Sequence, residues 1–455
     1  MKKTEKLVLI ISIAASFIAF LDGSVVNVAL PAISGELGGG LTTQQWVNDA
    51  YLITLGALIL AAGSFSDLFG RRRVLKYGLY GFLITSLLCA VAPTAEFLIV
   101  ARALQGVAGA LVTPSSLALI MSRFSGAQKS KAVGVWTAWT GMAFIVGPLV
   151  GGFLVDVLSW RYIFAINILP IAITVFLLAK LPGVSREKRQ DHVDWMGIVL
   201  AVAALSGIVF ALIEQGNYGW NHWLIISSLA VGIISLTAFL LHEKRTASPL
   251  VPSFLFKERN FSAGNIATFF IYAALPLQSF LIVIFLQQVA KYSAFEAGVA
   301  FLPVTLVMFF LSSRFGGLAG RFGPRWFMTL GPLIGAIGVL LIAMTTSSAA
   351  PYWTQIFPGV MIFGLGLSVT VAPLTAAVLS SVPESRSGIA SAINNTISRI
   401  AGLIAIAAIG LVMGTAVTLE GFKSAMLVCV ALLVVGGFVS MVGIRNNTSP
   451  LNSRR

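Results

Sequence analysis

The sequence predicts an all-α integral membrane protein with 14 transmembrane helices. Of its 455 residues, 57% are hydrophobic and only 10% are charged, and a soluble fold cannot bury that much apolar surface. The apolar residues form runs of roughly 20, the length that crosses about 30 Å of hydrocarbon as a helix. We expect the spans near residues 7–30, 43–63, 74–92, 96–120, 132–155, 162–181, 196–214, 222–241, 261–289, 296–315, 326–346, 354–379, 388–413 and 422–443.

The net charge of +14 does not indicate nucleic-acid binding, because the basic residues are sorted by side of the membrane. With the N-terminus inside, only Arg161, Lys291 and Lys423 fall in outer segments, and Arg102 falls within a span. The other basic residues fall on the inner side, as the positive-inside rule requires. We therefore expect a multi-pass protein of the cell membrane with both termini in the cytoplasm.

An internal repeat predicts how the spans are grouped. Residues 63–72 (GSFSDLFGRR) follow the second span, and residues 316–325 (GGLAGRFGPR) follow the tenth at an offset of 253. Two related halves of six spans are typical of transporters, whose substrate site lies between the halves near the midplane. We expect two pseudo-symmetric six-helix bundles and two inserted transmembrane helices, with boundaries at 1–190, 191–245 and 246–455.

Enzymatic and metal chemistry find no support in the sequence. The two cysteines, Cys89 and Cys429, lie in apolar runs, and the three histidines form no ligand set. There is no nucleophile–base set and no phosphate-binding loop of the form G-x4-G-K-S/T. We expect no metal, no cofactor and no ATP-driven pump.

Three charged residues lie well inside the predicted spans of the first half. Asp22 is in span 1, Asp49 in span 2 and Arg102 in span 4. At 1.5 Å per residue, all three fall roughly 9–12 Å below the outer surface. A carboxylate at mid-span costs about 2.5–3.5 kcal/mol on insertion scales, so such a residue is a functional candidate. We expect one ionisable layer, with Asp22 as the main proton acceptor and Asp49 coupled to it.

Each residue of this layer also has a structural interpretation. Asp22 could make only a structural hydrogen bond to span 4, and Asp49 could face water at the outer end of span 2. Arg102 requires an acidic or carbonyl partner in either case, and its distance from Asp22 could switch that carboxyl between its protonated and ionised states.

Two glycine-containing motifs point to moving parts. Between spans 2 and 3, the spacing G-x3-D-x2-G-R-R favours a gate latch, and a carboxylate there can cap the third helix; the alternative is a topology signal. Its residues are Gly63, Asp67, Gly70, Arg71 and Arg72. The fifth span is predicted to be a weak, closely packed helix, or ordinary small-residue packing, through Gly141, Gly147, Pro148, Gly151 and Gly152.

With these motifs, nearly the whole chain resembles the major facilitator superfamily, specifically its 14-span drug:proton antiporter family. The resemblance implies rocker-switch alternating access, efflux of lipophilic compounds, proton influx, and a glycine-rich fifth span that marks antiporters. It rests on residues 21–31 (LDGSVVNVALP), 46–51 (WVNDAY), the 63–73 loop, R102-x2-Q105-G106, G141-x5-G147-P148-x2-G151-G152 and 160–167 (WRYIFAIN).

The second half departs from the pattern at two points. Gly320 stands where the first half has Asp67, so the second latch should be weaker. The later spans also hold no midspan acid, since Glu214, Glu296 and Glu420 fall at outer ends. Family members that expel dications tend to use additional membrane carboxylates, so the sequence favours lipophilic or monocationic drugs.

A drug site of this kind should be an apolar cavity with a few orienting polar groups and aromatic rings. Packing or lipid contact is the alternative for each candidate. The candidates are Asn27, Tyr51, Trp136, Trp139 and Met142 in the first half, and Asn265, Phe269, Tyr272, Gln278 and Phe280 in span 9.

The expected partners are small lipophilic substrates, protons and membrane lipids, with no nucleic acid, and the expected functional unit is a monomer. Two other functions stay open. The cargo could be a lipid, a fatty acid or a secreted metabolite moved by the same proton coupling, or the chain could be a membrane receptor that transports nothing.

Overall fold

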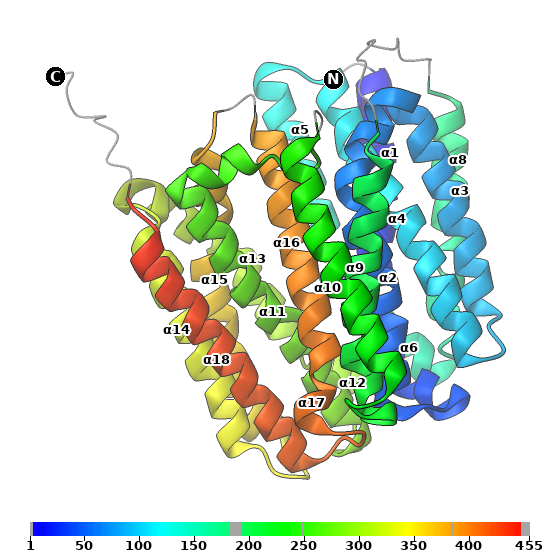
Figure 1. The fold of residues 1–455 in the computed structure, drawn as a ribbon, viewed down its shortest axis with the longest axis vertical. Coiled ribbons are helices and arrows are strands. Elements are labelled where there is room, and N and C mark those ends of the chain that lie inside the picture. Colours follow the sequence, from blue (N-terminus) through cyan, green and yellow to red (C-terminus); the bar gives the residue numbers. More distant parts are fainter. Residues whose placement is uncertain (1–2, 182–192, 247–248, 384–385, 447–455) are drawn as a thin grey trace. The chain divides into compact units, whose positions relative to one another are not determined.

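The computed structural model is all-helical over the residues it describes, which are 3–181, 193–246, 249–383 and 386–446 without the side chains of Lys3, Leu60, Asp67, Ala127 and Ser130 (Figure 1). The first part of the chain contains α1 (Lys3–Leu37), α2 (Gly40–Phe69), α3 (Arg71–Ala90), α4 (Ala95–Arg123), α5 (Gly126–Gly141), α6 (Ala143–Val157), α7 (Tyr162–Ala165) and α8 (Ile168–Ala179). A hairpin of α9 (Trp195–Tyr218) and α10 (Trp223–Arg245) follows.

The rest of the described chain continues as helices joined by short turns. These are η1 (Ser253–Lys257), α11 (Arg259–Gln288), α12 (Ala294–Val299), α13 (Leu302–Phe322), α14 (Arg325–Thr345), η2 (Tyr352–Ile356), α15 (Phe357–Ser380), α16 (Ser387–Ala408), α17 (Gly410–Met413) and α18 (Leu419–Gly443). The predicted all-α class is confirmed.

Twelve helical segments of the described chain are long and apolar enough to cross a membrane. Helices α2 and α3 occupy the predicted second and third spans but are not among the twelve. The first turn of α3 begins with three arginines, Arg71 to Arg73, which lower the hydropathy of a helix only 20 residues long. The count of fourteen spans stays a prediction.

One predicted boundary differs from the structure. The motif expected as a loop after span 2 is mostly helical, because α2 continues to Phe69 and only Gly70, at φ 91°, separates it from α3. A positive φ is the conformation that glycine adopts at low cost. The predicted fifth span is found as one helical segment, Lys131–Val157, which passes from α5 to α6 at Met142.

The described chain divides into two compact units. The first comprises residues 1–251, 286–299 and 406–417, and the second comprises 252–285, 300–405 and 418–455. Two short pieces of the later sequence therefore belong to the first unit. One is the end of α11 with α12, and the other is the end of α16 with α17. We call the end of the first unit where α1 stops and α2 begins its distal end.

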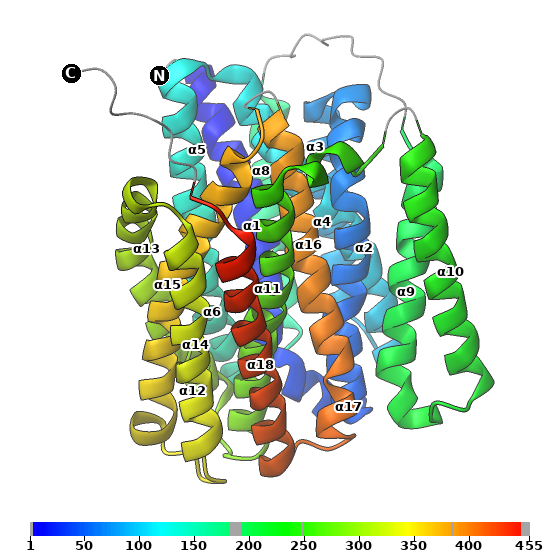
Figure 2. The same cartoon turned by 60° about the vertical axis from the view of Figure 1, so that its left-hand side comes forward.

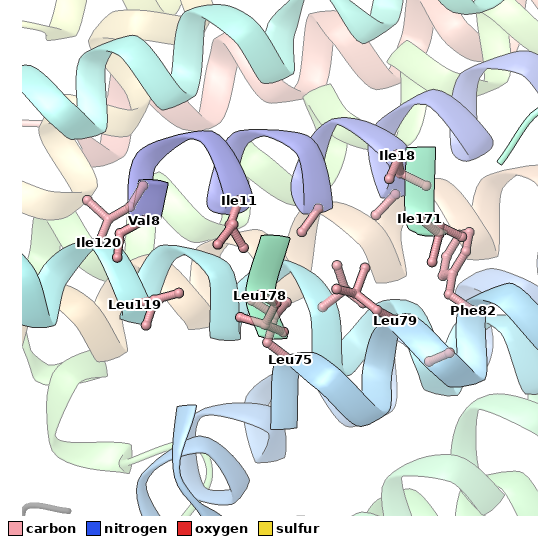
Figure 3. Close-up of a cluster of buried hydrophobic side chains, with 14 of the residues drawn as sticks. Val8, Ile11, Ile18, Leu75, Leu79, Phe82, Leu119, Ile120, Ile171 and Leu178 are labelled. Atoms are coloured by element: carbon pink, nitrogen blue, oxygen red, sulfur yellow. The ribbon is translucent and has the colours of Figure 1, made fainter. Parts of the chain in front are cut away.

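The core of the first unit lies between α1, α3, α4 and α8 (Figure 3). Val8, Ile11 and Ile18 of α1 face Leu75, Leu79 and Phe82 of α3, with Leu119 and Ile120 of α4 and Ile171 and Leu178 of α8 beside them. Steps of three and four residues place these side chains on one face of each helix. This core holds in place the side chains that lie further along the same helix faces, toward the distal end.

The second unit is built around α14, which packs against both α15 and α18, while α13 packs against α15 (Figure 2). Glycines permit the close α14–α15 approach. A side chain on Gly338 would meet the carbonyl oxygen of Gly359, and one on Gly366 would meet the backbone of Gly331 and Gly335. Small residues at such crossings are typical of helices that pack in membranes.

Candidate functional site

Four helices of the first unit carry buried stripes that end in polar residues at one level. The polar residues occupy the next core position of each stripe, so they converge where the apolar core stops. The stripes are Val8–Ile11–Ala15–Ile18–Asp22 on α1, Leu75–Leu79–Phe82–Ser86 on α3, Leu119–Ser116–Val112–Gly109–Gln105–Arg102 on α4 and Leu178–Thr174–Ile171–Asn167 at the start of α8.

Asp22 and Arg102 form a buried ion pair at this level. Arg102 Nη1 donates to Asp22 Oδ2 at 2.6 Å, and the side chains are 1% and 0% exposed. The other carboxylate oxygen, Oδ1, accepts from Gln105 Nε2 at 2.9 Å and from Asn167 Nδ2 at 2.9 Å. Three side-chain donors, one of them charged, therefore hold the two carboxylate oxygens of Asp22.

Arg102 has partners other than Asp22. Its Nε donates to the carbonyl oxygen of Val47 at 3.1 Å, and its Nη1 also donates to Gln105 Oε1 at 2.7 Å. The guanidinium lies 4.4 Å from the centre of the Tyr51 ring, within the range of a cation–π contact. These contacts would keep the guanidinium solvated by protein if Asp22 became neutral.

Asp49 is also buried, at 0% exposed, but its surroundings differ. Its Oδ1 accepts from Asn48 Nδ2 at 2.9 Å, and its Oδ2 has no hydrogen-bond partner among the described residues. Val47 and Tyr51, which contact Arg102, lie two residues to either side of Asp49. With 3.6 residues per turn, Asp49 points to the opposite face of α2.

The two carboxyl groups therefore have different electrostatic surroundings. A buried site without a cation beside it is a costly place for a charge. Asp49 has this environment, whereas Asp22 has the guanidinium of Arg102. The sequence placed the three residues at one depth; the structure pairs two of them and turns the third away.

The gating motif contacts the end of α8 through Arg72, whose Nη2 donates to the carbonyl oxygen of Ala179, the last residue of that helix, at 3.1 Å. Gly63 is helical and has open space around it, and Arg71 begins α3. Gly70 is the N-cap of α3 and supplies no side-chain cap. The side chain of Asp67, predicted to cap this helix, lies outside the described residues.

The glycines of the fifth span divide by position. A side chain on Gly147 would collide with Ser24, and one on Gly151 would collide with Val25, so both allow α6 to approach α1. Gly152 likewise allows the backbone of Phe295 in α12 to approach. Pro148 lies within the same helix, beside Gly298 of α12. Gly141 has open space around it.

Of the cavity candidates in the first unit, Asn27 and Trp136 have free polar atoms. Asn27 Oδ1 and Trp136 Nε1 are buried and have no hydrogen-bond partner among the described residues. Trp139 and Met142 are 52% and 39% exposed. Tyr51 lies under the Arg102 guanidinium, so its ring contacts the cation of the ion pair.

In the second unit, Gln278 is the outstanding candidate. It is 0% exposed, and neither its amide nitrogen nor its amide oxygen has a partner among the described residues. Asn265 is committed to structure, because it donates to the carbonyl oxygen of Phe261 and accepts from Asn394 at 3.1 Å. Phe280 is fully buried, Phe269 packs edge-on against Phe270, and Tyr272 is half-buried.

Sequence reasoning missed Asn167 and Ser86. Asn167 Nδ2 and Gln105 Nε2 both donate to Asp22 and lie near Ser86 Oγ, at 3.5 and 3.0 Å. The available signal was a polar residue at a core position of an apolar stripe. Among the described residues, no group of three or more His, Cys, Asp or Glu side chains could hold a metal ion.

Residues 13–406 match the Major Facilitator Superfamily, and this stretch includes the whole Asp22–Arg102 site. The chain belongs to this superfamily. The resemblance to the superfamily is thereby confirmed, and this superfamily member is a multi-pass membrane transporter rather than an enzyme.

Relatives of this transporter carry the names of drug-resistance proteins. It is 35% identical over 409 residues to puromycin resistance protein pur8 of Streptomyces alboniger, which covers 88% of this chain and 80% of that one. It is 32% identical over 416 residues to multidrug transporter protein MdtP of Bacillus subtilis (strain 168), covering 90% and 76%. A methylenomycin A resistance protein of the same organism is 31% identical, covering 90% and 88%.

Solved structures of other transporters share the fold. A peptide transporter POT in complex with sulfate aligns with a TM-score of 0.69 and 16% identity, covering 95% of this chain and 93% of that one. A D-xylose-proton symporter aligns with a TM-score of 0.68 and 14% identity, covering 97% and 98%. At these identities the likeness concerns the fold alone.

Proposed function

We propose that this transporter exports lipophilic or monocationic drugs in exchange for protons. The observation that carries the proposal is the buried Asp22–Arg102 pair in a chain whose relatives are named for resistance to puromycin, methylenomycin A and multiple drugs. An ion pair buried in a transmembrane bundle is expensive, and such groups mark proton and substrate pathways.

The proposed proton switch uses the two carboxyl groups differently. In the conformation described here, the carboxylate of Asp22 accepts hydrogen bonds from Arg102 Nη1, Gln105 Nε2 and Asn167 Nδ2. Because Oδ1 already accepts two amide donors, a proton would be taken up at Oδ2, the oxygen that Arg102 would have to release. Asp49, whose Oδ2 is buried without a partner among the described residues, is a second candidate carrier.

Arg102 is the element that would be displaced. Val47 and Tyr51 of α2 bind its guanidinium independently of Asp22, so a small shift of α2 against α1 could draw Arg102 from the carboxylate without exposing it to lipid. One proton crossing 100 mV supplies about 2.3 kcal/mol, which is roughly a fifty-fold concentration gradient.

Free polar atoms suggest which residues meet the drug. Asn27 Oδ1, Trp136 Nε1 and both amide atoms of Gln278 are buried without partners among the described residues, and native proteins rarely leave such groups unsatisfied. We propose that these atoms form hydrogen bonds with substrate when it is bound and with water when it is not. The proposal includes a functional monomer with both termini in the cytoplasm, as the distribution of basic residues predicts.

The decisive experiment uses proteoliposomes with an imposed pH gradient, and puromycin and ethidium as probes. Asp22→Asn should abolish gradient-driven transport, because the amide can neither pair with Arg102 as an anion nor carry a proton. Glu420→Gln, at an exposed carboxylate in the first turn of α18, is the matched control and should transport normally. Full coupled transport by Asp22→Asn would reject the proton switch.

A cellular experiment separates the cargo from the coupling. Expression of the transporter in a sensitive strain should raise puromycin resistance, and a protonophore should remove that gain. No change in resistance to any drug, together with an altered lipid composition when the protein is deleted, would contradict drug export.

A further inference from the structure

Helices α9 and α10 form a hairpin that joins the rest of the first unit through one side only. Helix α10 packs on α9, where Gly207 and Gly232 bring the two backbones together. The outward face of α10 is apolar and exposed, including Trp223, Ile226 and Ile234. The main contacts of the hairpin with other elements run from α9 to α2 and α17.

Trp46 of α2 is the residue that α9 holds. Its Nε1 donates to Glu214 Oε1 at 2.7 Å, and its ring lies 6.0 Å from the ring of Phe210, one turn earlier on α9. The second oxygen of Glu214 accepts from Asn217 Nδ2 at 2.8 Å, which fixes the carboxylate. A charge-assisted bond with a preset acceptor is the strong kind of side-chain hydrogen bond.

The residue beside Trp46 holds a different element. Gln45 is 2% exposed, and its Nε2 donates to the carbonyl oxygens of Ile406 and Ala407 at 2.7 and 3.1 Å. These carbonyls lie at the end of α16, which stops at Ala408. The last carbonyls of a helix lack partners within the helix. The Ile406 carbonyl oxygen also accepts from the backbone N–H of Ile409 at 3.3 Å, so Gln45 adds a second donor at Ile406 and supplies a donor to Ala407.

Helix α9 also touches the segment that Gln45 holds. A side chain on Gly216 of α9 would lie 3.7 Å from Thr415 Cγ2, and α17 packs on α9. Thus α2, α9 and segment 406–417 meet at the distal end of the first unit. We call this meeting point the distal junction and define it by Gln45, Trp46, Glu214, Ile406 and Ala407.

Segment 406–417 is connected at both ends to the second unit, because the chain enters the first unit at Ile406 and leaves it at Thr418. A transport cycle that rearranges the two units must either carry this segment along or release it from Gln45 and α9. Release of the segment would break the hydrogen bonds of the distal junction.

We propose that the α9–α10 hairpin is the fixed wall of a distal gate, and that Trp46 and Glu214 are positioning residues that hold α2 against it. Held in this way, Gln45 presents its amide to the end of α16. The proposal assigns a role to the hairpin and goes beyond the proposed drug export, because it concerns opening of the distal junction whatever the cargo is.

The test measures how often the junction opens, using a cysteine at Ala407, which is 0% exposed. The single-cysteine reporter Ala407→Cys is made with Cys89 and Cys429 replaced by Ser, in the full-length protein in proteoliposomes. A membrane-impermeant maleimide then labels it from the distal side. Trp46→Phe keeps an aromatic ring but removes the N–H, and should speed labelling by roughly tenfold through loss of a charge-assisted bond. Trp223→Phe, on the exposed face of α10, is the matched control and should leave the rate unchanged.

A second variant protects the test against a folding defect. Glu214→Leu removes the acceptor from the α9 side and should give the same acceleration as Trp46→Phe, and combining the two should add little. The proposal is overturned if the folded variant of either kind labels at the parental rate, or if Trp223→Phe accelerates labelling as much as Trp46→Phe does.

Discussion

Arg72 and Arg325 occupy equivalent positions of the internal repeat, and each donates to a carbonyl near the end of the last helix of its own sequence half. Arg72 Nη2 donates to Ala179 O of α8 at 3.1 Å, and Arg325 Nε donates to Met441 O of α18 at 2.8 Å. A cation at a helix C-terminus satisfies free carbonyls and the negative end of the dipole. The basic position of the motif thus has a local structural role in both units.

The first prediction concerns stability at these two positions. Arg325→Ala should lower the free energy of unfolding by about 1–2 kcal/mol, and Arg72→Ala by about half as much, because a charged donor to a helix end is lost at a half-exposed site. The measurement is reversible unfolding of the purified protein in mixed micelles. Arg314→Ala, at an exposed arginine of α13, is the control and should not differ from the parent.

The second prediction concerns the buried ion pair. Arg102→Met or Asp22→Asn alone should destabilise the protein by about 3–5 kcal/mol. Arg102→Met leaves the buried carboxylate without its cation, and Asp22→Asn leaves the buried guanidinium without its anion. The double variant should be more stable than the less stable of the two single variants, since no lone charge remains. The same unfolding assay measures this as a double-mutant cycle. Strictly additive losses would show that the two residues do not act as a pair.

The third prediction separates Asp49 from Asp22. Asp49→Asn keeps the size of the side chain and introduces no charge at a buried site that has no cation beside it, so the free energy of unfolding should change by no more than about 1 kcal/mol. Gradient-driven transport should nevertheless fall, because the amide cannot release a proton.

A large loss of stability in Asp49→Asn would instead indicate a hidden cationic partner. Unchanged coupled transport would remove Asp49 from the proton pathway. Asp22→Asn, measured in the same unfolding assay, provides the comparison, because the same chemical change there should be costly.

The sequence predicted the Asp22–Arg102 pair because hydrophobic length fixes depth, and two opposite charges at one depth in a bilayer have few other partners. It did not separate Asp49 from that pair. Depth says nothing about the direction in which a side chain points. The face of α2 that turns toward Arg102 is known only from the residues that Arg102 contacts. Val47 and Tyr51, two positions to either side of Asp49, decide that face only once the packing is known.

Asn167 shows a second limit of sequence reasoning. It is 145 positions from Asp22 along the chain, and nothing local marks it as a ligand of that carboxylate. The apolar stripe that ends at Asn167 places it in a core but does not say which core. Conversely, the loop expected after span 2 is helical to Phe69 because its residues between Gly63 and Gly70 do not break a helix.

The fourth prediction tests whether the fifth-span glycines are needed for close packing. Gly147→Ala should destabilise the protein by about 1–3 kcal/mol, because the added methyl group would collide with Ser24 of α1. Gly141→Ala is the matched control in the same motif and should be neutral or slightly stabilising, since no atom lies within 4 Å of the place that its methyl group would take. Equal effects at the two positions in the unfolding assay would contradict α1–α6 packing as the reason for Gly147.

The fifth prediction distinguishes a substrate amide from a structural one on α11. Gln278→Leu removes a fully buried amide that has no partner among the described residues, so stability should be unchanged or higher. Substrate affinity should fall, and ethidium binding to the purified protein, followed by fluorescence, measures that loss. Asn265→Leu should do the opposite, because it removes hydrogen bonds to Phe261 and Asn394. It should cost about 1–3 kcal/mol of stability while leaving the affinity of the folded protein within about twofold. A Gln278→Leu protein that binds ethidium as the parent does would show that this amide does not meet the drug.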